Sequence, residues 1–453
     1  MPGHSDSHGG DPLVNLIIHR GTKEIGGSCV ELRAQGKSLI LDLGMPLVNK
    51  DGSPFDETEA KGTAADLVAK GILPDVPGLY GDGPCNVVGV VLSHAHADHY
   101  GLAHHVRPDV PVFASEGTKA LLDVGQIFLP NAGETRNLQV VPRTKMWKPV
   151  DIGPFVVRLH PVDHSAPDAV AIEVVGERKK VFYSGDLRGT GWKKKLFYHL
   201  LDHPPRHVDA MLMEGSSLGR KEGKYGCPDE PAVERAIIEE IKGSDNLALL
   251  FCSGQNVDRI VTAYKAAKLT GRQLVIGLYE AYVLDQLRFL SDKLPQYAWP
   301  DIRVRFWGHQ MRSLREHGHG DFIEAVRATR HGITEEGIVT RRGKVLMLAR
   351  ANKYLPTITR KLPSLDGLRL VWSMWNGYLK RNSENPFKAF CAGRDLTWRE
   401  IHASGHASIE DLRRLVQAVQ PRWLVPIHTF HHDEYGQFGV PVRQVKDGEA
   451  LVL

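Results

Sequence analysis

The chain contains 453 residues, of which 42% are hydrophobic, and carries a formal net charge of +4. This length predicts about two to three domains, and the mild positive charge permits nucleic-acid binding without requiring it. No apolar run approaches the roughly 20 residues that cross a bilayer, and the polar start MPGHSDSHGGD lacks the apolar segment of a secretory signal. We therefore expect no membrane span, and we expect residues 1–11 to form a disordered arm.

The cysteines argue against a disulfide framework. They are Cys29, Cys85, Cys227, Cys252 and Cys391, an odd number spaced far apart and without a C-x-x-C pair. Small secreted domains instead use paired and closely spaced cysteines. We therefore expect reduced thiols and a cytoplasmic protein.

Residues 12–227 are expected to form a strand-rich first domain. Its apolar runs alternate apolar and polar residues or are rich in β-branched residues, and glycines separate them. A helix is expected over 118–128, between two of the strands. The strands are expected at 13–21, 28–34, 38–44, 84–93, 110–115, 155–163, 169–175 and 179–186.

Beyond Pro228 helices and strands alternate strictly. Helix, strand, helix, strand and helix are expected over 229–243, 246–254, 256–271, 272–279 and 280–292. Such alternation indicates a parallel sheet with crossover helices. The loop-like RNSENPF near Arg381 ends this region, so we place an inserted domain at 228–382. The rest of the first domain, 383–453, should hold a helix at 409–419, a strand at 423–428 and further strands to the end.

The most informative stretch is VLSHAHADHYG, at Val91–Gly101. It follows the continuous β-branched run NVVGVVLS, which reads as a buried strand, and a helix over HYGLAHHV should come next. Imidazole and carboxylate groups together suit zinc and similar divalent ions. The pattern H-x-H-x-D-H therefore predicts a metal site. Its residues are His94, His96, Asp98 and His99.

Five further polar side chains follow apolar strands or precede a helix. Each taken singly is at least as often a capping or surface residue. Together they supply the ligands and acids that a two-metal hydrolase needs. They are His164 after FVVRLHPV, Asp186 after VFYSG, Glu214 after VDAMLM, His406 before the helix at 409–419, and His428 at the end of WLVPIH.

The motifs SHAHADH, DHSAPDA, YSGDLRG, MEGSSLG, ASGHAS and VPIH, in this order, resemble the metallo-β-lactamase superfamily. More narrowly they resemble its β-CASP branch and, with the opening GTKEIGGSCVEL, the ribonuclease J family. The resemblance covers nearly the whole chain. It implies an α/β fold: a four-layered αββα sandwich with a smaller α/β β-CASP domain inserted between Glu214 and His406.

The resemblance also implies a role for each site residue. His94, His96 and His164 would hold one metal, and Asp98, His99 and His428 the other. Asp186 would bridge both ions, which are expected to be Zn²⁺, with Mn²⁺ as the alternative. His406 would be the general acid, and the Glu214 carboxylate would orient its ring and favour its protonated form.

The resemblance implies a hydrolase of phosphodiester bonds in nucleic acid, most simply a ribonuclease acting on single-stranded RNA, and two metals could supply that chemistry. Three alternatives stay open: a DNA nuclease of the same branch, a small ester or thioester hydrolase, and a non-catalytic scaffold. Endonuclease or exonuclease action also stays open, because after KVLMLAR the chain reads ANKYLPT where ribonuclease J has T-G-S-Q-G-E. A homodimer is one oligomeric state that the resemblance allows.

Two further features of the insert have a functional and a structural interpretation. The basic residues Arg341, Arg342, Lys344, Lys380 and Arg381 could track phosphates, and a solvated charged face explains them equally well. The aromatic stretch VWSMWNGYL (371–379) could stack bases, but packing is the favoured interpretation, because Trp and Tyr bury a large area.

Overall fold

The computed structural model describes residues 13–49, 52–129, 132–219, 226–351, 355–380 and 385–453. The predicted arm at 1–11 and the basic residue Arg381 lie outside these ranges. Within them no helix is both long and apolar enough to span a membrane. All five cysteines are described, and all are free thiols.

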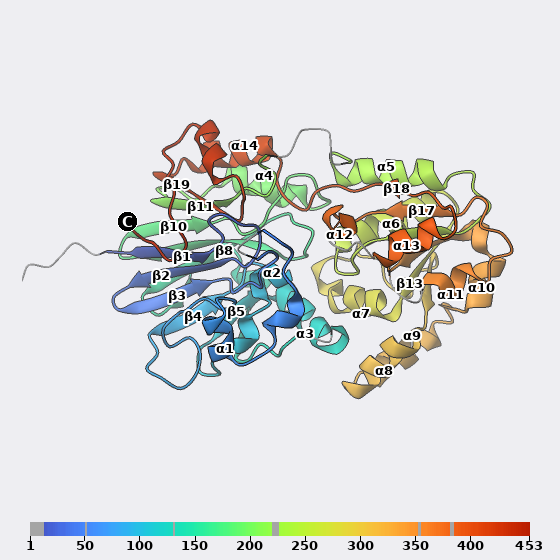
Figure 1. The fold of residues 1–453 in the computed structure, drawn as a ribbon, viewed down its shortest axis with the longest axis horizontal. Coiled ribbons are helices and arrows are strands. Elements are labelled where there is room, and N and C mark those ends of the chain that lie inside the picture. Colours follow the sequence, from blue (N-terminus) through green and yellow to red (C-terminus); the bar gives the residue numbers. More distant parts are fainter. Residues whose placement is uncertain (1–12, 50–51, 130–131, 220–225, 352–354, 381–384) are drawn as a thin grey trace, which may run out of the picture.

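Two sheets form the first lobe, on the left in Figure 1. The first sheet has the order β20 (Ala450–Val452), β1 (Asn15–Arg20), β2 (Cys29–Ala34), β3 (Lys37–Leu41), β4 (Val87–Val91), β5 (Val112–Ser115) and β6 (Leu138–Val141). The second has the order β19 (Trp423–Ile427), β11 (Ala210–Glu214), β10 (Lys179–Tyr183), β9 (Val170–Gly176), β8 (Phe155–Pro161) and β7 (Val150–Ile152). Both are mixed: β3 to β6 run parallel, as do β10, β11 and β19.

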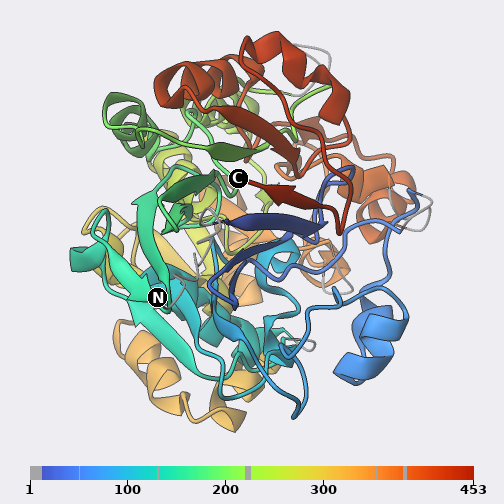
Figure 2. The ribbon, with the colours of Figure 1, turned by 90° about the vertical axis from the view of Figure 1, so that its left-hand side faces the viewer.

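The two sheets pack face to face around one apolar core. Leu16, Leu32 and Leu39 of the first sheet share a buried cluster with Leu159 and Ile172 of the second. Alternation along each strand sends every second side chain to this layer. The chain also closes on itself here, since β20 pairs with β1 through Leu451 and Leu16 (Figure 2).

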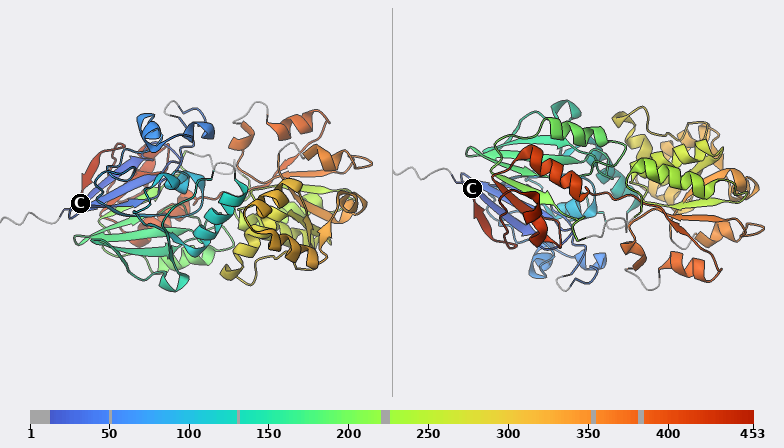
Figure 3. Two further views of the ribbon diagram at one scale, coloured as in Figure 1. Left: turned by 90° about the horizontal axis from the view of Figure 1, so that it is seen from below. Right: turned by 90° about the horizontal axis from the view of Figure 1, so that it is seen from above.

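Helices cover the outer faces of both sheets. α1 (Ala64–Ala69) and α3 (Glu116–Phe128) contribute Leu67 and Leu121 to the cluster on the first sheet. α4 (Lys194–Asp202) and α14 (Ile409–Val419) contribute Phe197 and Leu415 to the cluster on the second, and Figure 3 shows the red α14 lying along that face. The first lobe is therefore an αββα sandwich, and the predicted fold class is confirmed.

The third sheet forms the second lobe and is entirely parallel among its described pairs. Its order is β15 (Gly332–Ile333), β14 (Ile302–Arg305), β13 (Gln273–Gly277), β16 (Val345–Ala349), β12 (Ala248–Phe251), β17 (Arg369–Trp372) and β18 (Arg399–Glu400). One face packs on α5 (Glu230–Ile241), α6 (Val257–Leu269) and α7 (Leu278–Gln286), and α13 (Pro386–Ala392) packs on the other. The remaining helices are α8 (Gly308–Glu316), α9 (Gly320–Ala328), α10 (Glu335–Thr340), α11 (Leu355–Thr359) and α12 (Gly377–Lys380). The sheet continues past residue 382 as far as β18, and the exact domain boundaries stay a prediction.

Two expected elements differ from the structure. The helix after the histidine motif is the single turn α2 (Ala97–Tyr100), followed by a 3-10 turn at Ala103–His105. The expected run of strands after β19 is wrong: a 3-10 helix at His432–Phe438 comes first, and the only later strand in this described stretch is β20. Tyr435 and Phe438 of that 3-10 helix fill the core beneath α14, a packing that strand alternation does not provide.

The aromatic stretch at 371–379 is mixed in character. Trp372 is buried against Phe251 and Phe387, in agreement with the packing interpretation. Trp375 and Tyr378 are exposed, and their rings meet edge to face with centroids 5.6 Å apart. Base stacking by these two rings stays untested.

Candidate metal centre

The nine predicted site residues converge on one edge of the sandwich. They follow strands that end at the same edge: β4 precedes His94, β8 precedes His164, β10 precedes Asp186, and β19 precedes His428. Carboxyl ends of parallel strands meet at one edge, so segments far apart in the chain become neighbours. Two groups of potential metal ligands result, with Asp186 in both: His94, His96, His164 and Asp186 in one, and Asp98, His99, Asp186 and His428 in the other.

Asp186 is the centre of this arrangement. Its Oδ2 lies 3.2 Å from His99 Nε2, 3.8 Å from His94 Nε2 and 3.9 Å from His164 Nε2. Its Oδ1 lies 3.8 Å from His428 Nε2. These distances place imidazole nitrogens around both oxygens of one carboxylate, so Asp186 could be a ligand shared by two neighbouring cation sites.

Four atoms of this cluster are buried without a hydrogen-bond partner. They are the Nε2 atoms of His94, His99 and His428, and Oδ1 of Asp186. Buried polar atoms in folded proteins are nearly always hydrogen-bonded, so these four atoms on neighbouring side chains fit the role of metal ligands. The ring nitrogens His164 Nε2 and His96 Nδ1, 3.0 Å apart, fit the same interpretation. The donor set therefore fits divalent metal ions.

The charge states suit metal binding. Burial, together with His99 and His164, holds the pKa of His94 well below its usual value, and burial does the same for His164. Burial alone would raise the pKa of Asp186, but the facing His428 and His99 hold it well below its usual range. Metals bind neutral imidazole and ionised carboxylate, so most of the cluster is already in the binding form.

His99 is the exception. Burial opposes its protonation, but Asp186, Asp42 and Asp98 together raise its pKa well above the usual value. The proton on this ring and a divalent cation compete for the same negative surroundings. Metal binding at this position should therefore release a proton.

A layer of outer contacts orients the imidazoles. Asp42 Oδ2 lies 2.7 Å from His99 Nδ1 and also accepts hydrogen bonds from Ser93 and Tyr183. The Gly405 carbonyl lies 2.6 Å from His164 Nδ1, and Ser28 Oγ lies 3.0 Å from His428 Nδ1. Each contact occupies Nδ1 and directs Nε2 inward, the usual arrangement around metal-binding histidines.

Close backbone packing holds α2 in place. The carbonyls of Ala97, Asp98 and His99 accept hydrogen bonds from the backbone N–H groups of Met45, Ser28 and Leu43. The Ala97 carbonyl also accepts the helical hydrogen bond from the Gly101 N–H, and α2 ends at Tyr100. Gly44 is required at the contact, since a Cβ there would lie 1.7 Å from the Asp98 carbonyl oxygen.

Glu214 and His406 form the third group with Asp186. His406 Nδ1 lies 3.0 Å from Glu214 Oε2 and 3.7 Å from Asp186 Oδ2. Glu214 is buried and accepts hydrogen bonds from the backbone N–H groups of Leu187 and Ser216. The His406 side chain is 23% exposed, against 2% or less for His94, His164 and His428. His406 is therefore more accessible to solvent than these three histidines.

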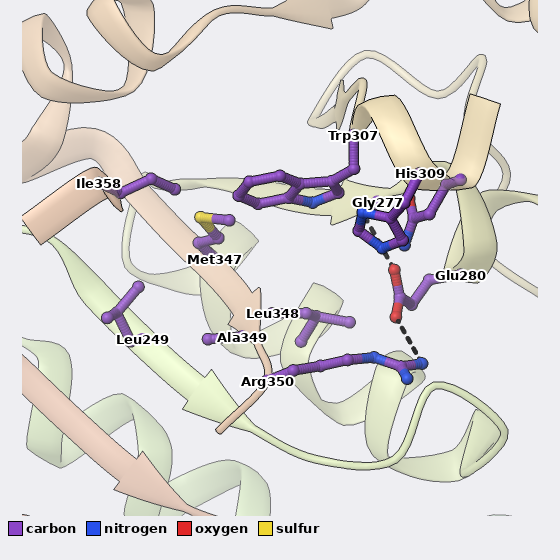
Figure 4. A pocket seen from close by; sticks show the side chains of 11 residues that line it. Leu249, Gly277, Glu280, Trp307, His309, Met347, Leu348, Ala349, Arg350 and Ile358 are labelled. Carbon is purple, nitrogen blue, oxygen red and sulfur yellow. Dashed lines mark hydrogen bonds and ion pairs between the residues drawn. The ribbon is translucent and has the colours of Figure 1, made fainter. Parts of the chain in front are cut away.

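A separate pocket opens at the carboxyl ends of β13, β14 and β16 (Figure 4). Trp307, Met347 and Ile358 form its apolar wall, and none of the nine predicted residues lines it. Its charged residues are matched to each other: Arg350 lies 3.5 Å from Glu280, which also accepts a hydrogen bond from the Gly277 N–H. We therefore place the candidate active site at the histidine cluster and not in this pocket.

Comparison with known proteins agrees with this geometry. A model of the beta-lactamase superfamily domain matches residues 65–235. This part of the chain is therefore similar to the β-lactamase superfamily domain. Ribonuclease J of Sinorhizobium meliloti is 25% identical over 84% of this chain and 66% of its own length. Ribonuclease J of Mycobacterium tuberculosis is 23% identical over 90% of this chain and 67% of its own length.

The chain thus spans about two thirds of the length of these curated relatives. Ribonuclease J 2 of Streptococcus pyogenes, at 21% identity, is similar over 97% of this chain. The predicted resemblance to ribonuclease J is confirmed. The crystal structure of a protein of unknown function from Enterococcus faecalis V583 has the same fold, with a TM-score of 0.75 at 20% identity over 97% of this chain and 100% of that chain.

Proposed function

We propose that this β-lactamase-superfamily chain is a divalent-metal-dependent nuclease that hydrolyses phosphodiester bonds in single-stranded RNA. The observation that carries the proposal is the set of four unsatisfied buried atoms around Asp186. The similarity to ribonuclease J, whose name describes an enzyme acting on RNA, favours this substrate over others.

Seven residues would hold two ions. His94, His96 and His164 would bind one, Asp98, His99 and His428 the other, and Asp186 both. When bound, two such ions lower the pKa of water to give a nucleophile near neutral pH and neutralise charge on the phosphate oxygens. The number of imidazoles favours Zn²⁺, and the two carboxylates also allow Mn²⁺.

His406 would protonate the departing sugar oxygen. The Glu214 carboxylate, 3.0 Å from Nδ1, would accept a hydrogen bond from Nδ1–H and stabilise the protonated imidazole, which would give its other proton from Nε2. Two backbone N–H groups hold Glu214 in place, so the ring keeps a single orientation. The exposure of His406 lets a substrate reach it.

Two rival functions differ in what they require. A small ester or thioester hydrolase needs the same metals but no second lobe of this size. A scaffold needs no ligands, whereas all seven proposed ligands are described and gathered here. A DNA nuclease needs the same site, and only substrate choice separates it from the proposal. A homodimer and a cytoplasmic location stay predictions from the sequence.

The experiment is a substrate panel on purified, metal-loaded protein. Single-stranded RNA and DNA oligonucleotides, labelled at either end and carrying a 5′-phosphate or a 5′-hydroxyl, are compared with lactones and thioesters. We expect cleavage of RNA, and the size of the first labelled product distinguishes end-directed from internal cutting. Turnover of lactones or thioesters without cleavage of either nucleic acid would contradict the proposal.

A further inference from the structure

A buried cluster of charged side chains lies beside the candidate metal centre. It consists of Asp163, Arg188, Glu230, Asp258 and Arg259, and we call it the boundary ion cluster. Both arginine side chains are fully buried. Arg188 Nη2 lies 2.5 Å from Asp258 Oδ2, and Arg259 Nη2 lies 2.9 Å from Glu230 Oε1.

The boundary ion cluster joins the two lobes. Asp163 and Arg188 follow β8 and β10 of the sandwich, whereas Glu230 begins α5 and Asp258 lies on α6 of the second lobe. Arg188 contacts both sides, since its Nη1 lies 3.4 Å from Glu230 and its Nε 3.5 Å from Asp163. A single guanidinium therefore connects the helices of the second lobe to the loops of the first.

Arg188 also contacts the segments that carry the site residues. Its Nη1 donates to the Ser404 carbonyl at 2.9 Å, and its backbone N–H donates to the Asp163 carbonyl at 2.7 Å. Ser404 precedes the Gly405 carbonyl that lies beside His164 Nδ1, and Ser404 Oγ accepts a hydrogen bond from the His406 N–H. Movement of Arg188 would thus be transmitted to His164 and His406.

Stability alone does not explain so many buried charges. Removing charges from water costs several kcal/mol per ion, and well-packed apolar residues usually stabilise a protein at least as well. The planar guanidinium, in contrast, fixes the relative orientation of the groups that it contacts, because its N–H donors form a rigid fork. Buried ion pairs of this kind specify one geometry in preference to neighbouring ones.

We propose that Arg188 is a positioning residue that fixes α5 and α6 relative to the metal centre, so that a polynucleotide lying across both lobes meets the reacting groups in register. This inference rests on the proposed function. A substrate that reaches only the metal centre should depend on this geometry much less than a polynucleotide does.

The test compares two substrates in three variants. Asp258→Asn weakens the link on the α6 side, and Arg188→Lys keeps the charge but loses the fork. Arg272→Lys is the matched control, because Arg272 is buried within the second lobe and donates to the carbonyls of Asn246 and Val345. The substrates are a single-stranded RNA oligonucleotide and bis(p-nitrophenyl) phosphate, a small phosphodiester.

We expect the ratio of kcat/KM for RNA to kcat/KM for the small diester to fall about ten-fold or more in Asp258→Asn and Arg188→Lys, since a misplacement of about 1 Å can cost 100-fold in rate. Metal content should be unchanged in Asp258→Asn, and the ratio should be unchanged in Arg272→Lys. A merely structural role would lower both activities in proportion to the folded fraction and leave the ratio intact, which would overturn the inference.

A fourth variant covers the case in which Asp258→Asn and Arg188→Lys both prevent folding. Lys193 is 26% exposed, and its Nζ contacts Asp258 at 2.6 Å and Asp163 at 3.8 Å, so Lys193→Met loosens the same link without burying a charge. We expect a smaller fall in the same ratio, and an unchanged ratio would overturn the inference. Wild-type protein that hydrolyses neither substrate would contradict the proposed function instead.

Discussion

At the scale of single residues, His406 and His428 lie close together but have different surroundings. Their rings stack with centroids 5.8 Å apart. His428 is buried, and its unsatisfied Nε2 faces Asp98 and Asp186. His406 is partly exposed and directs Nδ1 to Glu214. This difference separates a proposed ligand from a proposed acid.

We expect His428→Ala to lose bound metal and His406→Ala to keep it. His406→Ala should slow RNA cleavage by about 10²–10⁴-fold, the usual contribution of a general acid. Metal analysis of both purified variants, with cleavage rates measured on the same samples, provides the check. Because His406, Glu214 and Asp186 could themselves hold an ion, loss of metal from His406→Ala would reassign His406 as a ligand.

The sequence patterns predicted the candidate ligands and the candidate acid better than the residues that hold them in place. Each of the nine predicted residues stands beside an apolar strand or a helix start, a signal that is visible in the chain. Asp42 also follows an apolar strand, β3, but its role could not be predicted, because its partners Ser93 and Tyr183 are distant in sequence and its positive φ of 59° is visible only in the folded chain. Arg188 was likewise missed, although it lies in YSGDLRG, because two of its acidic partners, Glu230 and Asp258, belong to the other lobe.

At the scale of elements, the short helix α2, which follows β4, positions two of the candidate metal ligands. One turn of helix carries Asp98 and His99, and three backbone N–H groups hold it: two from the loop containing Gly44 and one from Ser28. Helical periodicity alone predicts a longer helix here. The sequence pattern does not show the hydrogen bonds that the carbonyls of α2 make with other segments. The parallel third sheet was predicted because strict alternation of strands and helices allows few other arrangements.

We expect Gly44→Ala to lower both metal content and the free energy of unfolding. Its Cβ would meet the Asp98 carbonyl oxygen at 1.7 Å, a backbone atom that moves only if α2 moves. The control is Gly308→Ala at the start of α8, where nothing lies within 4 Å of an added Cβ. Metal analysis and chemical unfolding of the two variants decide; normal metal content in Gly44→Ala would show that α2 tolerates displacement.

At the scale of the whole molecule, buried carboxylates link stability to pH. Burial alone would raise the pKa of Glu31, but hydrogen bonds from His19, Arg33 and Ser38 lower it to about 2. The pKa of Glu173 and of Glu230 is also lowered to about 2, against burial, by their basic neighbours. A carboxyl whose folded pKa is depressed stabilises the protein above its ordinary pKa, and this stabilisation is lost as the pH falls towards 2.

We therefore expect Glu31→Gln to reduce the free energy of unfolding more at about pH 6 than at about pH 3, because the wild-type carboxylate progressively loses its advantage as it becomes protonated. Urea unfolding at a series of pH values measures this difference. Glu57→Gln, at an exposed position, serves as the control and should change stability little at either pH. A deficit in Glu31→Gln that is equal at both pH values would contradict the linkage.

The central claim is that the cluster around Asp186 is a two-metal nuclease centre, and metal titration of RNA cleavage tests it most directly. Metal-free protein is supplied with increasing Zn²⁺ or Mn²⁺, and bound metal and cleavage of a labelled single-stranded RNA are measured together. The account predicts no cleavage without metal, a plateau at about two bound ions per chain, and neither binding at that level nor cleavage in Asp186→Ala. Full cleavage by the metal-free protein, or by Asp186→Ala, would contradict it.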